Sequence, residues 1–218
     1  MFSQSEENYL KAIYQLSLRT KEGVSTNDIA KKLDTKASSV SDMIKRLSEK
    51  KLIEYKKYYG VRLTKDGEQI ASSVVRKHRL WEVFLVDKLN FSWDEVHDVA
   101  EQLEHIQSPK LIEELDAFLG FPKKDPHGDP IPDKDGNLHI VAKTLLSNLK
   151  AGEKGICIGV KDSSSEFLKY LDRQDVKLGD EITVLAKEDY DDSIHIKIDK
   201  RELNISKKIA SNLYIQTP

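Results

Sequence analysis

The sequence has a single cysteine, Cys157, and this scarcity limits its chemistry. One thiol cannot form an internal disulfide or a thiolate-rich zinc site, and the surrounding run GICIGV is typical of a buried strand. Any metal site must therefore use nitrogen and oxygen ligands.

Long apolar runs are also missing. No stretch of about 18 apolar residues occurs, and the first ten residues, MFSQSEENYL, lack the basic start and apolar core of a signal peptide. We therefore expect a cytoplasmic protein with no membrane partner. The chain is 39% hydrophobic and 33% charged with few glycines and prolines, which excludes a fibrous or wholly disordered protein.

The net charge of −2 conceals an uneven distribution of charge along the chain. Residues 1–80 hold 17 Lys and Arg against 10 Asp and Glu, residues 81–136 hold 5 against 14, and residues 137–218 hold 13 of each. A basic first third suits a polyanion, whereas an acidic middle third suits cations or simply increases solubility. Charge alone would equally fit uneven solvated faces, so the residue pattern has to decide.

Three short helices are predicted in the first third. Apolar residues recur at helical spacing over residues 4–18, Ser25 and Asp28 can cap a second helix, and a third begins near Ala37. The third helix would present small hydroxyl and charged side chains outward: Lys36, Ser38, Ser39, Ser41, Asp42, Lys45 and Arg46. Two short helices joined by a tight turn, the second with such a face, are typical of a recognition helix for the major groove of DNA.

A basic hairpin is predicted after the third helix. Residues 50–63 hold two β-rich runs around Gly60, and Lys56, Lys57 and Arg62 near the turn could neutralise phosphates. A helix-turn-helix without a wing also occurs in protein-binding modules, and a helical domain with a solvated basic face is the simpler alternative. The basic hairpin favours double-stranded DNA.

The middle third concentrates histidine and carboxylate side chains. One predicted helix runs from Lys65 to about Leu89, and a second opens at Phe91, with a capping box of Ser92 and Glu95, and continues to about residue 105. At about 100° per residue, the second helix places four potential ligands within an arc of roughly 100°. These four are His97, Glu101, Glu104 and His105.

His78 and Glu82, one turn apart on the first of these helices, could complete the cluster. Mixed imidazole and carboxylate sites suit divalent first-row ions, and a set without thiolate favours Mn²⁺ or Fe²⁺, although the general affinity order would favour Zn²⁺ or Cu²⁺. Any single pair would more simply be a surface charge or a hydrogen-bonded histidine. An ion held here next to a DNA-reading head would act as a switch.

The last third of the sequence predicts a small all-β domain. Residues 121–136 contain four of the six prolines and form a linker, and strand-like runs follow at 156–161, 181–187, 194–199 and 213–216, with a short helix at 165–171. The predicted fold class is therefore mainly α with a C-terminal all-β part. The predicted domains are a winged helix-turn-helix over residues 1–73, a helical metal-binding and dimerisation domain over 74–136, and an SH3-like small barrel over 137–218.

Five segments together resemble one known family, the metal-dependent repressors of the diphtheria toxin repressor and manganese transport regulator type. The segments are SEENYLKAIYQL, VSTNDIAKKLDTKASSVSDMIKRLSEKKLI, VVRKHRLWEVFL, WDEVHDVAEQLEH and DPHGDPIP, and they cover nearly the whole chain in order. The resemblance implies a homodimeric repressor that binds a palindromic operator when Mn²⁺ or Fe²⁺ is bound. It also makes the C-terminal part similar to a ferrous-transport accessory module.

The resemblance implies ligands at particular positions. The family places metal ligands at the positions of His78, Glu101, Glu104 and His105. It has an ancillary site at the positions of Glu82 and His97, and the C-terminal domain would supply Glu166 as a further ligand to that site. A helix-capping role for Glu166 is equally open. Glu101 stands where iron-responsive members carry cysteine and manganese-responsive members glutamate, so Mn²⁺ is favoured, Fe²⁺ is second, and Zn²⁺ or other ions can bind in vitro.

Two positions depart from the family pattern. Asn8 stands where Met or Asp is usual, and its carbonyl oxygen can still bind a cation. Lys11 stands where many manganese members carry Glu, and its ammonium group would repel a nearby cation.

Two other function classes are compatible with parts of the sequence. A di-metal enzyme could gather Glu and His from the same helices, but such sites use Glu-x-x-His, and the residue three before His105 is Gln102. A metal-buffering accessory protein would leave the basic winged helix unexplained. We therefore predict a regulator without enzymatic activity or an organic cofactor.

Overall fold

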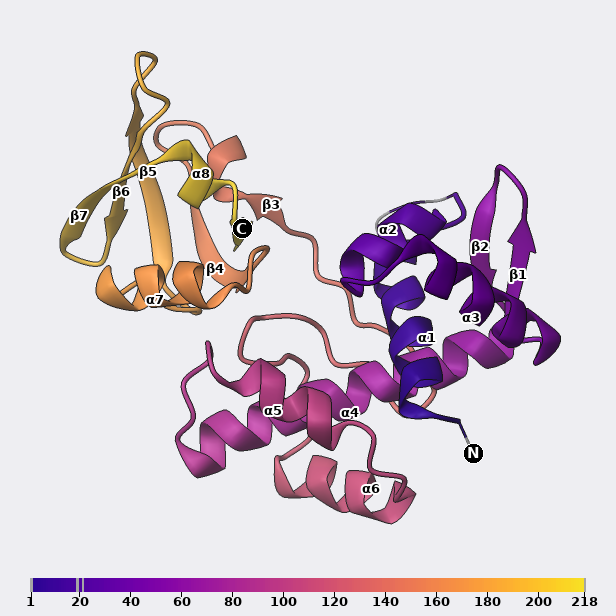
Figure 1. The fold of residues 1–218 in the computed structure, drawn as a ribbon. Helices are drawn as coiled ribbons and strands as arrows, with labels where there is room; N and C mark the ends of the chain where they lie inside the picture. Colours follow the sequence, from indigo (N-terminus) through magenta and orange to yellow (C-terminus); the bar gives the residue numbers. More distant parts are fainter. Residues whose placement is uncertain (1, 19, 21, 218) are drawn as a thin grey trace. The chain divides into compact units, whose positions relative to one another are not determined.

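The computed structural model describes residues 2–18, 20 and 22–217, and it divides into two compact units (Figure 1). The first unit comprises residues 1–81, 100–118 and 131–138, and the second comprises residues 82–99, 119–130 and 139–218. Each unit has its own apolar core. None of the described helices is long and apolar enough to span a membrane.

The first unit begins with the predicted winged helix-turn-helix. Helices α1 (Gln4–Ser17), α2 (Thr26–Lys32) and α3 (Ala37–Glu49) are followed by the antiparallel strands β1 (Ile53–Lys56) and β2 (Gly60–Leu63). Ser25 caps α2 by accepting a hydrogen bond from the amide of Asp28, as expected. Fully buried Leu10, Ile29 and Leu47 join the three helices through one core.

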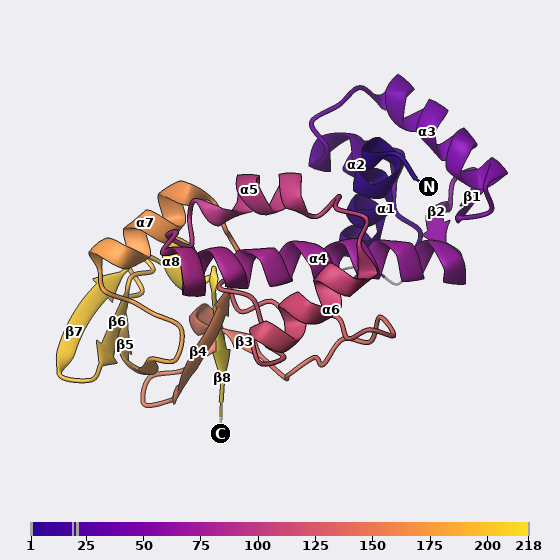
Figure 2. The same ribbon diagram turned by 90° about the horizontal axis from the view of Figure 1, so that it is seen from below.

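Three further helices follow the wing. Helix α4 (Lys65–Leu89), seen along its length in Figure 2, has the predicted bounds, and Thr64 Oγ1 accepts a hydrogen bond from Gly67 at its start. Helix α6 (Pro109–Phe118) is preceded by Ser108, and its Asp116 pairs with Arg76 of α4.

Helix α5 (Val96–Leu103) is shorter than predicted at both ends. Residues 93–95 form a turn, and Glu104 and His105 lie beyond the last helical residue. The expectation that Glu104 and His105 continue a regular helical face with His97 is therefore wrong. Both side chains instead belong to the turn that reverses the chain toward α6.

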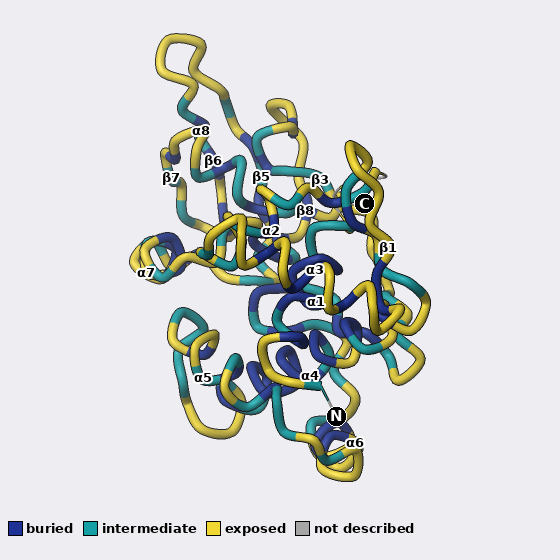
Figure 3. Tube along the Cα trace, turned by 45° about the vertical axis from the view of Figure 1, so that its right-hand side comes forward, coloured by how far each residue is buried: buried dark blue, intermediate teal, exposed yellow. Residues whose placement is uncertain are grey.

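The second unit is built on a six-stranded antiparallel sheet with strand order β3-β8-β4-β5-β6-β7. Its strands are β3 (Thr144–Leu145), β4 (Lys154–Val160), β5 (Glu181–Lys187), β6 (Ile194–Ile198), β7 (Arg201–Ile205) and β8 (Leu213–Gln216). A 3-10 turn (Leu146–Asn148) and helices α7 (Ser165–Arg173) and α8 (Lys207–Ala210) complete it. The prediction missed β3 and β7. Cys157 is buried in β4, and the acidic turn at residues 189–192 lies exposed between β5 and β6 (Figure 3).

The proline-rich segment is more ordered than a linker prediction implies. Asp125 Oδ1 accepts hydrogen bonds from the amides of His127 and Asp129, and Asp125 and His127 are both buried. Gly128 has a φ of +87°, and a Cβ there would lie 2.1 Å from the carbonyl oxygen of Ile158. Only glycine therefore fits where this loop meets β4.

Candidate metal centre and nucleic-acid interface

Six charged or imidazole side chains of the first unit form a group that we call the primary cluster. Its members are Glu7, Lys11, His78, Glu101, Glu104 and His105. Lys11 Nζ contacts Glu101 Oε1 and lies 2.9 and 2.7 Å from the two carboxylate oxygens of Glu104. The cluster therefore joins α1 of the winged helix to the C-terminal end of α5.

Glu104 is the centre of the cluster and has no exposed surface. Its Oε2 lies 2.7 Å from His78 Nδ1, and its Oε1 lies 3.7 Å from His105 Nε2. The first distance is a hydrogen bond, whereas the second is too long for one. The Oε1 side of Glu104 thus faces an imidazole nitrogen without a direct bond between them.

Glu7 joins the cluster from α1, although it was not among the predicted ligands. Its Oε2 lies 2.6 Å from His105 Nδ1, and its Oε1 accepts a hydrogen bond from Gln107 Nε2 at 2.7 Å. When His105 donates from Nδ1 to this carboxylate, its Nε2 is left with the lone pair that binds metals. The only sequence signal for Glu7 is an acid adjacent to Asn8, and its burial requires the tertiary structure.

Asn8 provides the test of whether these residues suit an ion. Its side-chain Oδ1 is buried and has no hydrogen-bond partner among the described residues. Buried polar atoms are normally satisfied, so an orphaned carbonyl oxygen on the α1 face that carries Glu7 and Lys11 fits a bound cation. An oxygen and nitrogen donor set of this kind suits Mn²⁺ and Fe²⁺.

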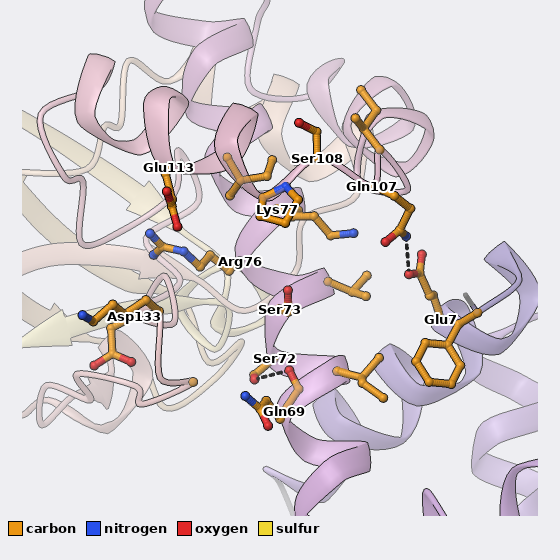
Figure 4. Close-up of a pocket in the computed structure, with 18 of the residues that line it drawn as sticks. Glu7, Gln69, Ser72, Ser73, Arg76, Lys77, Gln107, Ser108, Glu113 and Asp133 are labelled. Atoms are coloured by element: carbon orange, nitrogen blue, oxygen red, sulfur yellow. Dashed lines mark hydrogen bonds between the residues drawn. The ribbon is translucent and has the colours of Figure 1, made fainter. Parts of the chain in front are cut away.

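A cavity of about 570 Å³ adjoins the primary cluster (Figure 4). Glu7, Gln107, Arg76 and Lys77 are among its lining residues, and Gln107 is hydrogen-bonded to Glu7. Burial lowers the pKa of Lys77, while the charges of Glu7 and Glu104 oppose that shift. Lys77 is therefore a second ammonium group whose charge acts on the cluster.

A second group lies within the second unit, and we call Glu82, Asp125 and His127 the second cluster. All three are buried, and each offers a ligand atom within 4.8 Å of the others. His127 Nδ1 lies 3.8 Å from Glu82 Oε2 and 4.0 Å from Asp125 Oδ1. His127 Nε2 donates to the carbonyl oxygen of Trp93 at 2.8 Å, because a carbonyl can only accept.

This arrangement directs Nδ1 of His127 at two carboxylates. Burial lowers the pKa of His127, but the interaction with the Glu82 carboxylate, 3.8 Å away, and the charge of Asp125 outweigh it and raise the pKa to about 9. A proton on Nδ1 therefore balances the carboxylates, and a divalent ion could replace it. The sequence prediction included Glu82 but missed Asp125 and His127, whose only signal was the segment DPHGDPIP.

The remaining predicted ligands lie at the margin of the second cluster. His97 Nδ1 is 3.6 Å from Glu82 Oε1, and the His97 side chain is 60% exposed. Glu166 is exposed in the first turn of α7, and the second cluster does not include it. His97 and Glu166 stay predictions.

The predicted DNA-contacting side chains form one exposed set. All seven on or beside α3 are exposed: Lys36, Ser38, Ser39, Ser41, Asp42, Lys45 and Arg46. No side chain caps the amide groups at the start of α3, so these amides can meet a phosphate. Ser41 Oγ donates to the carbonyl oxygen of Ala37, which leaves its lone pairs outward.

The wing extends this exposed set. Lys56 ends β1, Lys57 lies in the turn, and Arg62 lies on β2 opposite Glu54. Tyr58, at the tip, is 91% exposed and has a φ of +71°. The wing therefore presents basic and aromatic groups that suit a nucleic-acid backbone.

Family models match three consecutive parts of the chain. The N-terminal DNA-binding domain of iron-dependent repressors matches residues 1–61, their metal-binding and dimerisation domain matches residues 64–133, and the FeoA domain matches residues 144–217. Together with the winged helix and the His and carboxylate clusters, these matches define a DNA-binding regulator with a metal-binding domain.

Individual relatives agree with these matches. A manganese-dependent transcriptional repressor in complex with manganese is 34% identical, with 98% of this chain and 100% of that chain covered and a TM-score of 0.88. The manganese regulator SloR is 38% identical, with 98% of each chain covered and a TM-score of 0.76. The iron-dependent repressor IdeR of Mycobacterium tuberculosis is 37% identical over 128 residues, which are 58% of this chain and 54% of IdeR.

The chain belongs to the diphtheria toxin repressor and manganese transport regulator family of metal-dependent repressors. The resemblance found in the sequence and the predicted fold class are confirmed. The matched region is about half the length of the first curated relatives, including the diphtheria toxin repressor of Corynebacterium jeikeium at 34% identity over 131 residues.

Proposed function

We propose that this protein is a metal-activated transcriptional repressor that binds operator DNA as a homodimer and controls metal-uptake genes. One observation carries the proposal: α1 of the winged helix places Glu7 and Lys11 in the same buried cluster as Glu104 and His105. An ion bound there joins the DNA-reading part to the segment that follows α5.

Four residues are proposed to hold this ion. Asn8 Oδ1, Glu101, Glu104 and His105 Nε2 supply three oxygens and one nitrogen, and the orphaned Asn8 oxygen and the unbonded pair of His105 and Glu104 support that choice. His78, also predicted as a ligand, is hydrogen-bonded to the other oxygen of Glu104. Glu82, Asp125 and His127 are proposed as a separate site, with His97 at its edge.

The ion would contribute positive charge among buried carboxylates. Lys11 contacts both Glu101 and Glu104 but carries only one positive charge, so a divalent ion would neutralise the negative charge that remains. A ligand that binds one conformation better shifts the population toward it, so an ion that contacts α1 biases the orientation of the α2–α3 pair. The operator affinity of the winged helix then depends on the metal concentration.

Manganese is the favoured ion. The donor set lacks thiolate, and Glu101 supplies a carboxylate where a softer ligand would favour other ions. Relatives described as manganese-dependent and as complexes with Zn²⁺ and Cd²⁺ support a divalent ion of variable identity. Fe²⁺ is the second candidate.

Binding of fluorescent promoter DNA, followed by anisotropy with and without Mn²⁺, tests this proposal. We expect high affinity only with the ion, and a twofold-symmetric protected site in footprinting because a dimer presents two recognition helices. Lys45→Glu should weaken binding to all sequences and lower the salt dependence by about one counterion or more, whereas Lys154→Glu on β4 should not. DNA binding that ignores the ion would contradict the proposal.

A further inference from the structure

Lys11 is the one ammonium group that directly contacts two carboxylates of the primary cluster among the described residues. We propose that Lys11 is a permanent cation of the cluster, which occupies the place of a second metal ion and limits the cluster to one divalent ion per subunit. This inference rests on the proposed function, because it concerns the number of ions that the same cluster binds.

The two oxygens of Glu104 divide the cluster into two sides. Lys11 Nζ and His78 Nδ1 each lie 2.7 Å from Oε2, and Lys11 Nζ also lies 2.9 Å from Oε1, so the ammonium group bridges both oxygens. On the Oε1 side, His105 Nε2 stands 3.7 Å away. We place the ion between Oε1 and His105 Nε2, which no direct hydrogen bond joins, and Lys11 is the cation already shared by both oxygens of Glu104.

Lys11 is built into this position by α1. Lys11 follows Glu7 by four residues and Asn8 by three, so it lies on the α1 face that carries both, and its ammonium group reaches Glu104. The Lys11 side chain is only 8% exposed. Moving this buried ammonium group away would remove its positive charge from both carboxylates, which is unfavourable.

The charge of the cluster also fits one ion. Glu7, Glu101 and Glu104 carry three negative charges, and Lys11 and the nearby Lys77 carry two positive charges, with both imidazoles counted as neutral. One divalent ion changes the total from one negative to one positive charge. A second ion would leave three positive charges in a region of low dielectric constant, which is strongly unfavourable.

The charge of the cluster makes Lys11→Glu an informative substitution for counting bound ions. Lys11→Glu changes the charge by two units, which is the charge of one divalent ion, and adds a carboxylate ligand. The variant with two ions would carry the same total charge as the wild-type cluster with one. Lys11→Gln changes the charge by one unit, adds no carboxylate, and is the matched control.

The experiment uses the full chain with Glu82→Gln and His127→Gln, so that the second cluster does not contribute ions. Each protein is dialysed to equilibrium with Mn²⁺, and the bound ion is counted by elemental mass spectrometry and examined by electron paramagnetic resonance. We expect one Mn²⁺ with an isolated six-line spectrum in this parent and in Lys11→Gln. Lys11→Glu should bind two Mn²⁺ whose spectrum shows spin–spin coupling.

Two coupled Mn²⁺ ions in the parent would overturn the inference and leave the proposed function intact, as would a single ion in a folded Lys11→Glu variant. Circular dichroism checks the fold, and if Lys11→Glu does not fold, the count in the parent decides alone. A folded parent that binds no Mn²⁺ would instead refute the proposed function and the inference with it.

Discussion

The primary and second clusters use the same kinds of side chain but belong to different parts of the molecule. In the primary cluster, α1 of the winged helix supplies Glu7 and Lys11, and a lysine ammonium balances the carboxylates. In the second cluster, the carbonyl oxygen of His127 accepts a hydrogen bond from the amide of Val160 on β4. A proton on the His127 imidazole balances the carboxylates there. The elements that carry a cluster, rather than the types of its ligands, therefore determine which part of the protein a bound ion would affect.

This comparison predicts that the primary cluster controls DNA binding. His105→Ala should raise the Mn²⁺ concentration needed for promoter binding by about 100-fold or more, because a proposed ligand and the hydrogen-bond partner of Glu7 are both lost. Anisotropy titrations with Mn²⁺ measure this change. His195→Ala, on β6, removes a surface imidazole and is the matched control. An unchanged titration for His105→Ala would end the assignment of this residue as a ligand.

The second cluster should titrate with pH in metal-free protein. The pKa of His127 is raised from 6.5 to about 9, so its stabilising charge is fully present below pH 6.5 and is lost as the pH rises through about 9. We expect the free energy of unfolding to fall by on the order of 3 kcal/mol over this range. Urea unfolding of chelated wild type and His127→Gln at several pH values measures it. A fall of equal size in His127→Gln would assign the effect to another group.

Removing a ligand from the second cluster should affect DNA binding less than His105→Ala. Glu82→Gln keeps the shape of the side chain and removes its charge, so we expect about a tenfold loss of Mn²⁺ affinity at this site. Calorimetric titration would show the loss of one class of sites, while promoter affinity at saturating Mn²⁺ stays within about twofold of wild type. If promoter binding falls as far as in His105→Ala, the two clusters act as one switch and the comparison fails.

The sequence predicted the elements of both clusters better than their geometry. Local patterns located α3, the wing and α4, because capping residues and helical spacing act over a few residues. The end of α5 at Leu103 was missed because Glu104 and His105 are held by contacts with Lys11 and Glu7, which lie more than 90 residues away in the chain. Such long-range contacts leave no local periodicity.

The same limit explains the residues that were missed entirely. Asp125 and His127 lie in a proline-rich stretch that is typical of a linker, and their burial depends on the approach of β4 to Gly128. The position of Lys11 was noticed only as a departure from the family pattern. Its pairing with both Glu101 and Glu104 depends on the packing of α1 against the end of α5, which the sequence pattern does not specify.

The smallest predicted effect concerns Trp93, which contacts His127 of the second cluster. Its ring stacks on His127 at a centroid distance of 6.3 Å with an interplanar angle of 9°, and its Nε1 donates to Asp172 Oδ2 at 3.1 Å. Trp93→Phe keeps an aromatic ring but loses this hydrogen bond, and Asp172 is exposed, so we expect about 0.5–1 kcal/mol of destabilisation in urea unfolding. Tyr190→Phe, at a fully exposed side chain, is the control and should leave the free energy of unfolding unchanged. Because the hydrogen bond to Asp172 fixes the ring that stacks on His127, its loss should also weaken Mn²⁺ binding at the second cluster by a few-fold while the primary cluster is unaffected. A change at the primary cluster alone would show that the division drawn between the two clusters is incorrect.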